Sequence, residues 1–239
     1  MRRLQLSWTG AVVPHAPLLL PEVAGKKNAS ATAPVAEAVA SLDLGDPDVT
    51  LIASPHGSTT GVYARVEGNL DAFGPRGVDV SAPTDAELAA ALAREWGRPL
   101  LDEPADHGIV VPLRLLAATS PVVAVALGPD DADAFVQALL GVTRDRAIAF
   151  VASANTSAGL DERAPLPSLD GARDADEDVL DALRERPADL GRRLDALAAA
   201  GSCAVATLGA FGLLFPDRPC EVLAYAHPFG VGYPVAVAR

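Results

Sequence analysis

The chain has 239 residues, of which 50% are hydrophobic, 21% are charged and only 5% are aromatic, and its formal net charge is −12. A globular chain of this length buries about 70% of its unfolded surface, so a substantial core is expected. The acidic balance, with no basic patch, argues against nucleic acid as a partner. Lysine occurs only at Lys26 and Lys27, which disfavours a polybasic membrane anchor, and no stretch approaches the roughly 18 apolar residues that span a bilayer.

The amino-terminal run MRRLQLSWTGAVVPHAPLLLP is similar to a signal peptide in having two arginines before apolar residues. Gly10, Pro14 and Pro17 interrupt that run, and no small-residue cleavage site precedes charged sequence. Cys203 and Cys220 have neither a metal-binding spacing nor the pattern of a disulfide framework. We therefore expect a cytoplasmic protein without disulfide bonds.

Short apolar runs alternate with helical stretches along the chain, which is the pattern of an α/β protein. The expected fold is a central mixed or mostly parallel sheet flanked by helices. In chain order, strands are predicted at Leu6–Val13, Val49–Ala53, Val78–Ser81, Val122–Leu127, Ala147–Ala152, Glu221–Ala226 and Gly232–Val237. Helices are predicted between them at Pro34–Leu42, Thr84–Trp96, Asp130–Leu140, Asp174–Arg186 and Asp189–Ala200.

Several local features refine this arrangement. Thr84 is predicted to cap its helix, because Glu87 follows three residues later. The polar run Asp161–Asp178 is predicted to be a surface loop that leads into a helix and folds over a site. The apolar run Phe211–Phe215 is expected either in the core, the commoner outcome, or on the face of a homodimer. Because no repeat or long linker divides the chain, residues 1–239 are predicted to form a single domain.

The chain has only four histidines, and their positions are informative. His15, His56 and His227 each follow a predicted strand, and His107 precedes an apolar stretch that is expected to start a helix. Ligands of open α/β sheets bind beyond the carboxyl ends of strands, where imidazoles can converge on one cation. For His15 and His56 the metal-binding interpretation and a purely hydrogen-bonding one stay equally open. For His227 a hydrogen-bonding or surface role is preferred.

Common catalytic motifs are absent from the sequence. No GxGxxG opens a helix after a strand, and there is no Walker loop, GxSxG elbow or HExxH. The cysteines have no CxxC spacing and no obvious histidine partner, which makes a thiol nucleophile a weak hypothesis. These absences disfavour the usual nucleotide-binding and hydrolase functions.

Four strings occur in a characteristic order: VPHAPLLLPEV, ASPHG, DHGIVVPL and the closing YAHPFGVGYPVAVA. In these strings the chain resembles the class III extradiol ring-cleavage dioxygenase superfamily, to which the Memo-like proteins are related. The resemblance covers nearly the whole chain and is greatest to small single-domain bacterial members. It implies an α/β fold with a central mixed sheet.

The resemblance also implies a non-haem Fe(II) site made by two histidines and one carboxylate, where a catechol and O₂ bind side by side. His15 and His56 match the two histidine ligands of that family. His107 matches a histidine that lines the substrate pocket and performs acid/base or oxygen-binding work. Zinc or another divalent metal is the alternative to Fe(II), because imidazole suits several metals.

The sequence departs from the family pattern at two positions. Asn155 and Ala158 stand where the family string SGDLSH has its aspartate and its catalytic histidine, and the third metal ligand aligns with Ala206. A missing proton-transfer group costs about 10²–10⁴ in rate. The side chains considered as substitutes are Asp106, Glu22, Asp161, Glu162 and Cys203.

Two functional hypotheses follow. The first is an Fe(II)-dependent extradiol dioxygenase that acts on a small catecholic substrate with O₂. The second is a non-catalytic metal- or ligand-binding protein on the same fold, with a degenerate active site. A third hypothesis, without a functional site, is a scaffold protein whose histidines only form hydrogen bonds within loops. A third ligand within reach of both His15 and His56 favours the first hypothesis, and histidines that point apart exclude it.

Overall fold

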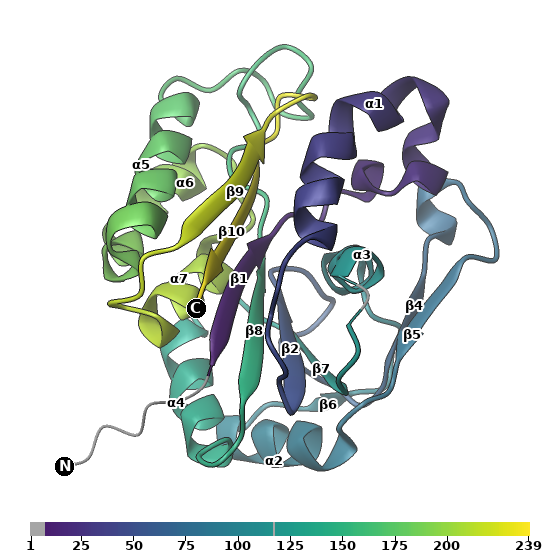
Figure 1. Ribbon diagram of the computed structural model, residues 1–239, viewed down its shortest axis with the longest axis vertical. Coiled ribbons are helices and arrows are strands. Elements are labelled where there is room, and N and C mark those ends of the chain that lie inside the picture. The colour runs from purple at the N-terminus through teal and green to yellow at the C-terminus, as the bar shows by residue number, and fades with distance from the viewer. Residues whose placement is uncertain (1–7, 117) are drawn as a thin grey trace.

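The computed structural model describes residues 8–116 and 118–239. Its centre is an eight-stranded sheet with the strand order β6-β3-β7-β2-β8-β1-β10-β9, and a separate small sheet pairs β4 with β5 (Figure 1). The strands are β1 (Thr9–Val13), β2 (Val49–Ser54), β3 (Gly61–Tyr63), β4 (Val66–Asn69), β5 (Asp79–Ala82), β6 (Leu100–Leu101), β7 (Val122–Ala126), β8 (Ile148–Ser153), β9 (Glu221–Ala226) and β10 (Tyr233–Ala238).

The middle of the large sheet is parallel. β7, β2, β8 and β1 all run in one direction, whereas β10 is antiparallel to both of its neighbours and β3 is antiparallel to β7. β2, β7 and β8 are buried along their whole lengths, which is why they read as continuous apolar runs instead of alternating ones. The predicted mixed, mostly parallel sheet is confirmed.

Helices cover both faces of this sheet (Figure 1). Val12 of β1 packs in one core with apolar residues of α2, α4, α5 and α7, whereas Ala11 and Val13 pack in the other core with residues of α1 and α3. The two cores alternate because successive strand side chains point to opposite faces. The helices are α1 (Pro21–Ala40), α2 (Ala86–Trp96), α3 (His107–Leu116), α4 (Ala132–Val142), α5 (Ala172–Glu185), α6 (Leu194–Ala199) and α7 (Val205–Leu214), with 3-10 turns η1 (Pro17–Leu19), η2 (Asp71–Phe73) and η3 (Pro187–Arg192).

The seven predicted strands are present, with ends shifted by a few residues. The first begins at Thr9, and Leu6 and Ser7 of its predicted range lie outside the described residues. The strand predicted at Val78–Ser81 is β5, which belongs to the small sheet and not to the large one. β3, β4 and β6 were not predicted, because segments of two to four residues carry too little periodicity to be recognised.

Two helix predictions need correction. α2 is capped by Asp85, whose carboxylate accepts a hydrogen bond from the Leu88 N–H at 2.9 Å. The prediction that Thr84 caps this helix is wrong, because its hydroxyl accepts instead from the Val66 N–H and so holds the start of β4. The helix predicted at Asp189–Ala200 is divided between η3 and α6.

The beginnings of the helices differ most from expectation. α1 begins well before the predicted Pro34, and its backbone is interrupted at Gly25, where φ is 64°. α3 begins at His107, as the apolar stretch after that residue suggested. α7 was not predicted, because it is apolar around most of its circumference and therefore shows no helical periodicity.

The apolar run Phe211–Phe215 belongs mainly to the core. Both terminal phenylalanines are buried, and a Cβ atom on Gly10 would lie only 2.6 Å from the Phe215 ring, so β1 and α7 approach each other closely. Leu213, between them, is exposed. The homodimer face considered for this run stays a prediction.

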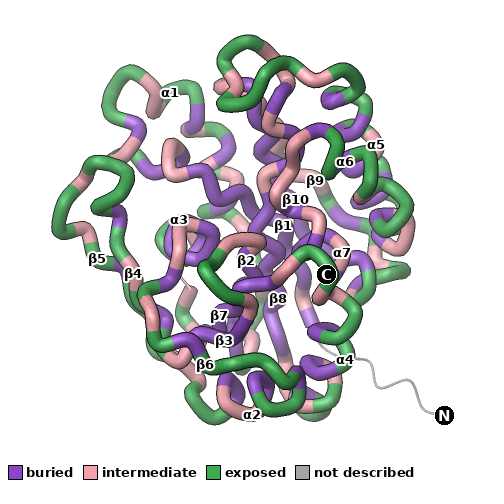
Figure 2. Tube along the Cα trace, turned by 180° about the vertical axis from the view of Figure 1, so that it is seen from behind, coloured by how far each residue is buried: buried purple, intermediate pink, exposed green. Residues whose placement is uncertain are grey.

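The burial pattern divides the molecule into a buried sheet and an exposed shell. Figure 2 shows buried residues concentrated in the central strands, with exposed residues along the outer helices and loops. Within the two described ranges, no helix combines the length and the apolar character needed to cross a membrane. Because β1, β2 and β8 are parallel neighbours, their carboxyl ends share one edge of the sheet.

Candidate metal centre

Three of the four histidines meet at that edge. His15 lies two residues beyond β1, His56 two residues beyond β2, and His107 is the first residue of α3. One ring nitrogen from each residue lies within 4.8 Å of the others. Nε2 of His15 and Nε2 of His56 are 3.1 Å apart. The structure therefore brings together the residues that the sequence selected as metal ligands and as acid/base group.

The His15 ring is fixed by a hydrogen bond at its Nδ1 atom. It is only 1% exposed, and its Nδ1 lies 2.9 Å from the hydroxyl of Ser153, the last residue of β8. The Asn155 side-chain carbonyl accepts a hydrogen bond from the His15 backbone N–H at 3.1 Å. A partner at Nδ1 fixes the ring and leaves Nε2 facing the other histidines, which is how proteins orient metal-binding imidazoles.

Asp106 organises the opposite side of the cluster. Its carboxylate accepts hydrogen bonds from the Gly108 N–H at 2.6 Å, the Ser54 hydroxyl at 3.0 Å and the Tyr63 hydroxyl at 3.0 Å. The Ser54 hydroxyl in turn accepts from the His56 N–H at 3.1 Å. Asp106 therefore positions the loop after β2 and the start of α3 together. With both oxygens engaged, it does not fit the role of substitute metal ligand.

Gly108 permits this close packing. A Cβ atom at this position would lie 2.1 Å from the Ser54 hydroxyl oxygen and 2.8 Å from a carboxylate oxygen of Asp106. Such separations are far inside van der Waals contact. The glycine of the DHG string is therefore required sterically, because α3 starts against the end of β2.

The site keeps its imidazoles neutral. Burial lowers the pKa of His15 well below its usual value, and the neighbouring His56 and His107 lower it further. Burial also lowers the pKa of His56, against the opposing charge of Asp106. The pKa of His107 is lowered by burial and by His56, again against Asp106. A neutral imidazole keeps a nitrogen lone pair, which is the form that binds metals.

A cysteine lies beside these rings. The Cys203 Sγ is 3.4 Å from Nε2 of His15, in the loop just before α7. Burial raises the pKa of the Cys203 thiol to about 11, with backbone hydrogen bonds opposing that rise. Ala206, which the sequence placed at the third-ligand position, is instead buried in the apolar core behind the sheet. Cys203, three residues before Ala206, is the residue of this segment whose side chain contacts His15.

The three histidines line a cavity of about 540 Å³. This volume lies within the range of small-molecule sites. Its walls are mainly apolar, and no carboxylate of a described residue lines it. Ala158 is part of the wall, so the position that carries a catalytic histidine in the family pattern is a methyl group here. The remaining lining residues are Ala16, Pro17, Leu18, Asn155, Thr156, Arg163, Pro165, Gly201, Cys203, Phe229, Val231 and Tyr233.

The other candidate substitutes are engaged elsewhere or are exposed. Glu22 pairs with Arg114 at 3.3 Å, and Asp161 pairs with Arg163. Glu162 is exposed, and none of these three carboxylates lines the cavity. Of the substitutes considered from the sequence, Cys203 is the one that reaches the histidines.

The donor set fits a divalent cation. Two nitrogens that bind one tetrahedral cation, each at 2.0–2.1 Å, are about 3.4 Å apart, which is close to the 3.1 Å between His15 and His56. Neutral imidazoles and a cysteine sulfur suit iron and zinc better than they suit magnesium or calcium. Ser54 and Ser153, which form hydrogen bonds that support the site, were not predicted from the sequence. The feature that could have indicated them is that each is a serine at the end of a mainly apolar strand.

The fourth histidine lies apart from this cluster. His227 follows β9 and lines a different cavity, and it is not among the grouped imidazoles. Its separation agrees with the preference for a role other than metal binding. Only the carboxyl ends of β1 and β2, and the start of α3, deliver histidines to the metal centre.

Comparison with known proteins identifies the family of this chain. Residues 9–236 match the model of a family described as the catalytic LigB subunit of aromatic ring-opening dioxygenase. No curated protein matches the chain. A crystal structure of the uncharacterized protein JW3007 from Escherichia coli K12 is similar, with a TM-score of 0.58 and 16% identity over 97% of this chain and 99% of that one. At that identity the similarity shows the fold alone. The match over nearly the whole chain establishes that the protein belongs to the LigB family.

Proposed function

We propose that the protein is a metal-dependent ring-opening dioxygenase that acts on a small catechol. The observation that carries the proposal is the convergence of three neutral imidazoles at one end of a mainly apolar cavity. A catechol fits within about 540 Å³ with room for O₂ beside it. The family, whose described activity is the opening of aromatic rings, supports this choice of chemistry.

His15 and His56 are the proposed metal ligands, since their Nε2 atoms lie 3.1 Å apart. Cys203 is proposed as the third donor, because its sulfur is 3.4 Å from the same His15 nitrogen. A bound divalent cation favours the thiolate over the thiol and so offsets the effect of burial on the pKa of this side chain. Fe(II), when bound, supplies Lewis acidity and redox chemistry with O₂.

His107 is proposed as the acid/base group. Its ring centroid is 4.5 Å from that of His56, so it faces the same end of the cavity. Because its lowered pKa leaves the ring neutral, it accepts a proton from a catechol hydroxyl at neutral pH. The apolar walls formed by residues such as Phe229 and Val231 limit the access of water to that proton.

The test is metal loading followed by O₂ consumption. Protein purified without oxygen and incubated with Fe(II) should retain one equivalent of iron, and the His15→Ala/His56→Ala double variant should retain none. The loaded protein should consume O₂ with at least one member of a catechol series, and His107→Ala should keep its iron but lose turnover. Loss of iron from His107→Ala would instead assign this residue as a ligand. Absence of bound metal from the wild type would overturn the proposal.

A second function is favoured by two observations. Ala158 occupies the wall position where the family pattern has a catalytic histidine, and no carboxylate from the described residues lines the cavity. Both features fit a protein that binds a metal or an aromatic ligand without oxygen chemistry. Stoichiometric metal with no O₂ uptake across the catechol series would decide for this alternative.

A further inference from the structure

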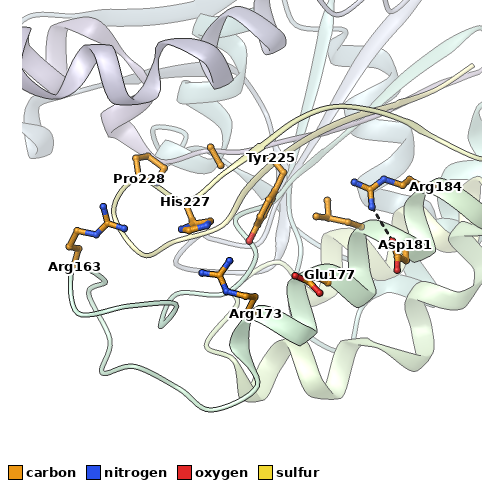
Figure 3. Close-up of a pocket in the computed structure, with 10 residues that line it drawn as sticks. Arg163, Arg173, Glu177, Asp181, Arg184, Tyr225, His227 and Pro228 are labelled. Carbon is orange, nitrogen blue, oxygen red and sulfur yellow. Dashed lines mark hydrogen bonds and ion pairs between the residues drawn. The ribbon is translucent and has the colours of Figure 1, made fainter.

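A second and larger cavity, of about 740 Å³, lies outside the metal centre. It is bounded by one side of α5 along nearly its whole length, from Arg173 to Arg184, by the end of β9 and by the polar loop that precedes α5 (Figure 3). Neither of the proposed functions uses this cavity. Its lining residues are Arg163, Arg173, Glu177, Leu180, Asp181, Arg184, Tyr225, Ala226, His227 and Pro228.

The charges in this cavity are unusual for the protein. The chain as a whole carries a formal net charge of −12, yet three guanidinium groups face only two carboxylates among the lining residues. Arg184 is neutralised by Asp181, which lies 3.0 Å away on the same helix. Arg163 is paired with Asp161 through two of its nitrogens. One cation and one carboxylate of the lining, Arg173 and Glu177, have no ion pair among the described residues.

Arg173 is that cation. Within the part of the chain that the structure describes, its guanidinium has no ion pair and no hydrogen bond, although Glu177 lies one helical turn away. Figure 3 shows Arg163 and Arg173 projecting from different parts of the chain towards the side of the cavity where His227 and Tyr225 lie. A solvated guanidinium keeps five N–H donors in a fork that matches carboxylate and phosphate oxygens.

His227 and Tyr225 provide polar groups next to Arg173. The Nδ1 atom of His227 is buried and has no hydrogen-bond partner among the described residues, so the fold does not commit that nitrogen to an internal bond. The Tyr225 hydroxyl donates to the buried carboxylate of Asp176, which fixes the ring and leaves the lone pairs of its oxygen. Burial raises the pKa of Tyr225, as does Asp176, while the charge of Arg173 opposes that rise, so the guanidinium lies near the phenol.

We propose that this cavity binds a small organic anion through its carboxylate or phosphate group, with Arg173 as the principal contact. Arg163, which is paired with Asp161, and the imidazole of His227 line the cavity beside that group and carry further N–H donors. Leu180 and Pro228 offer apolar contact to the remainder of the molecule. A single fork-shaped contact to an anion is a charge-assisted interaction and is about twice as strong as a neutral hydrogen bond. This site does not depend on the proposed metal chemistry.

Calorimetric titration of the full chain with inorganic phosphate and, separately, with succinate tests the proposal. Saturable binding of at least one probe is expected, and the stronger probe identifies the preferred head group. Arg173→Gln should weaken that binding by about tenfold, and Arg173→Lys should retain part of it, because lysine keeps the charge and loses the fork. Arg186→Gln is the matched control, since it removes the same charge from an exposed arginine outside the cavity.

Two further comparisons keep the result unambiguous. Binding should be unchanged in the His15→Ala/His56→Ala double variant, which separates this cavity from an anion bound at the metal centre. Unfolding curves of Arg173→Gln and Arg186→Gln should coincide, because both side chains are exposed. The proposal is overturned if neither probe binds, if Arg173→Gln binds as tightly as Arg186→Gln, or if the histidine double variant abolishes binding.

Discussion

The cavity lined by His15, His56 and His107 is called the histidine cavity here, and the cavity lined by Arg163, Arg173 and Arg184 is called the arginine cavity. Arg163 is part of both walls, but the basic side chains of the two cavities differ in their charge. In the first, burial removes the charge from three imidazoles and leaves lone pairs that face one another. In the second, the guanidinium groups stay exposed to solvent and keep their charge. The extent of burial therefore determines whether a basic side chain is charged, because desolvation disfavours the charged form. A buried, neutral histidine is therefore suited to bind a metal, and an exposed, charged arginine is suited to bind an anion.

A buried carboxylate connects the two cavities. Asp176 of α5 is fully buried and accepts hydrogen bonds from Tyr225, which lines the arginine cavity, and from Thr156, which lines the histidine cavity. It also accepts from the backbone N–H and the hydroxyl of Ser157. Four donors on one carboxylate compensate the cost of burying it. The shared wall therefore contains a buried polar network.

The largest expected effect is a loss of metal affinity, which should occur for histidines of the histidine cavity and not for His227. His15→Ala and His56→Ala should each lower metal affinity by about 100-fold or more, because each removes a proposed ligand. His227→Ala is the matched control, since that ring lies in the arginine cavity. Metal content measured by plasma mass spectrometry checks the prediction. Full occupancy in either variant, or equal loss in His227→Ala, would contradict the assigned site.

The next effect tests the shared wall. Asp176→Asn replaces one accepting oxygen with an amide group that donates, and because each oxygen accepts two of the four hydrogen bonds, two donors lose their acceptor. The free energy of unfolding should fall by about 3 kcal/mol, as measured by urea denaturation. Glu177→Gln is the comparison, because the neighbouring carboxylate is exposed. Equal stability of the two variants would show that the network does not hold the wall.

A substitution of Gly108 tests how closely α3 packs against the end of β2. Gly108→Ala should destabilise the protein by about 2 kcal/mol, because the new Cβ would overlap the Ser54 hydroxyl beneath the histidine cavity. Gly191→Ala is the control, since a Cβ there meets no atom within 4 Å. Urea denaturation compares the two. The close approach of α3 to β2 is refuted if Gly108→Ala costs no more than Gly191→Ala.

Cys203 offers a smaller effect within the histidine cavity. Cys203→Ser should weaken metal binding by about tenfold, because a hydroxyl is a poorer donor than a thiolate. In Co(II)-substituted protein the thiolate-to-metal absorption band should disappear. Cys220→Ala should keep that band, since the second cysteine is buried between α7 and β9, away from the histidines. A Co(II) spectrum unchanged by Cys203→Ser would remove the thiol from the ligand set.

The smallest expected effect concerns Asp85, which lies outside both cavities, and the loss of folding stability at acid pH. Burial raises the pKa of Asp85, but hydrogen bonds from Leu88 and Arg146 outweigh it and hold the pKa below the usual value. The stabilisation is therefore present above the pKa of the unfolded chain and is lost as the pH falls through the lower folded value. Asp85→Ala should cost about 1 kcal/mol at neutral pH, the usual value of a helix cap. Urea midpoints at several pH values would show this loss shrinking towards acid pH, and a loss independent of pH would contradict it.

The sequence predicted the parts of the site that follow long apolar strands. His15 and His56 were placed correctly at one sheet edge, because β1 and β2 are recognisable as buried apolar runs that end just before these histidines. The prediction of α3 after His107 followed from the apolar residues of that helix. The family pattern connected these three segments, and the structure adds the distances between their side chains.

Cys203, the third donor proposed above, was considered from the sequence only as one of several substitutes. Ala206 was aligned with a ligand because α7 has no polar face that marks its beginning. The hydroxyl of Ser202 donates to the Asn155 backbone carbonyl, and this contact between the end of β8 and the loop before α7 draws Cys203 towards His15. That contact spans 47 residues, and local patterns do not encode such a distance.

The sequence by itself determined the α/β class, the burial of the long strands and the identity of the histidines, because these depend on local hydrophobic periodicity and on short motifs. Only the tertiary structure decided which side chains meet. It brought Cys203 to the histidines, assigned Asp106 to support, and left His227 and Arg173 together in a separate cavity. The physical reason is that side-chain chemistry follows burial and distance, and both are set by the packing of segments that are far apart in the chain.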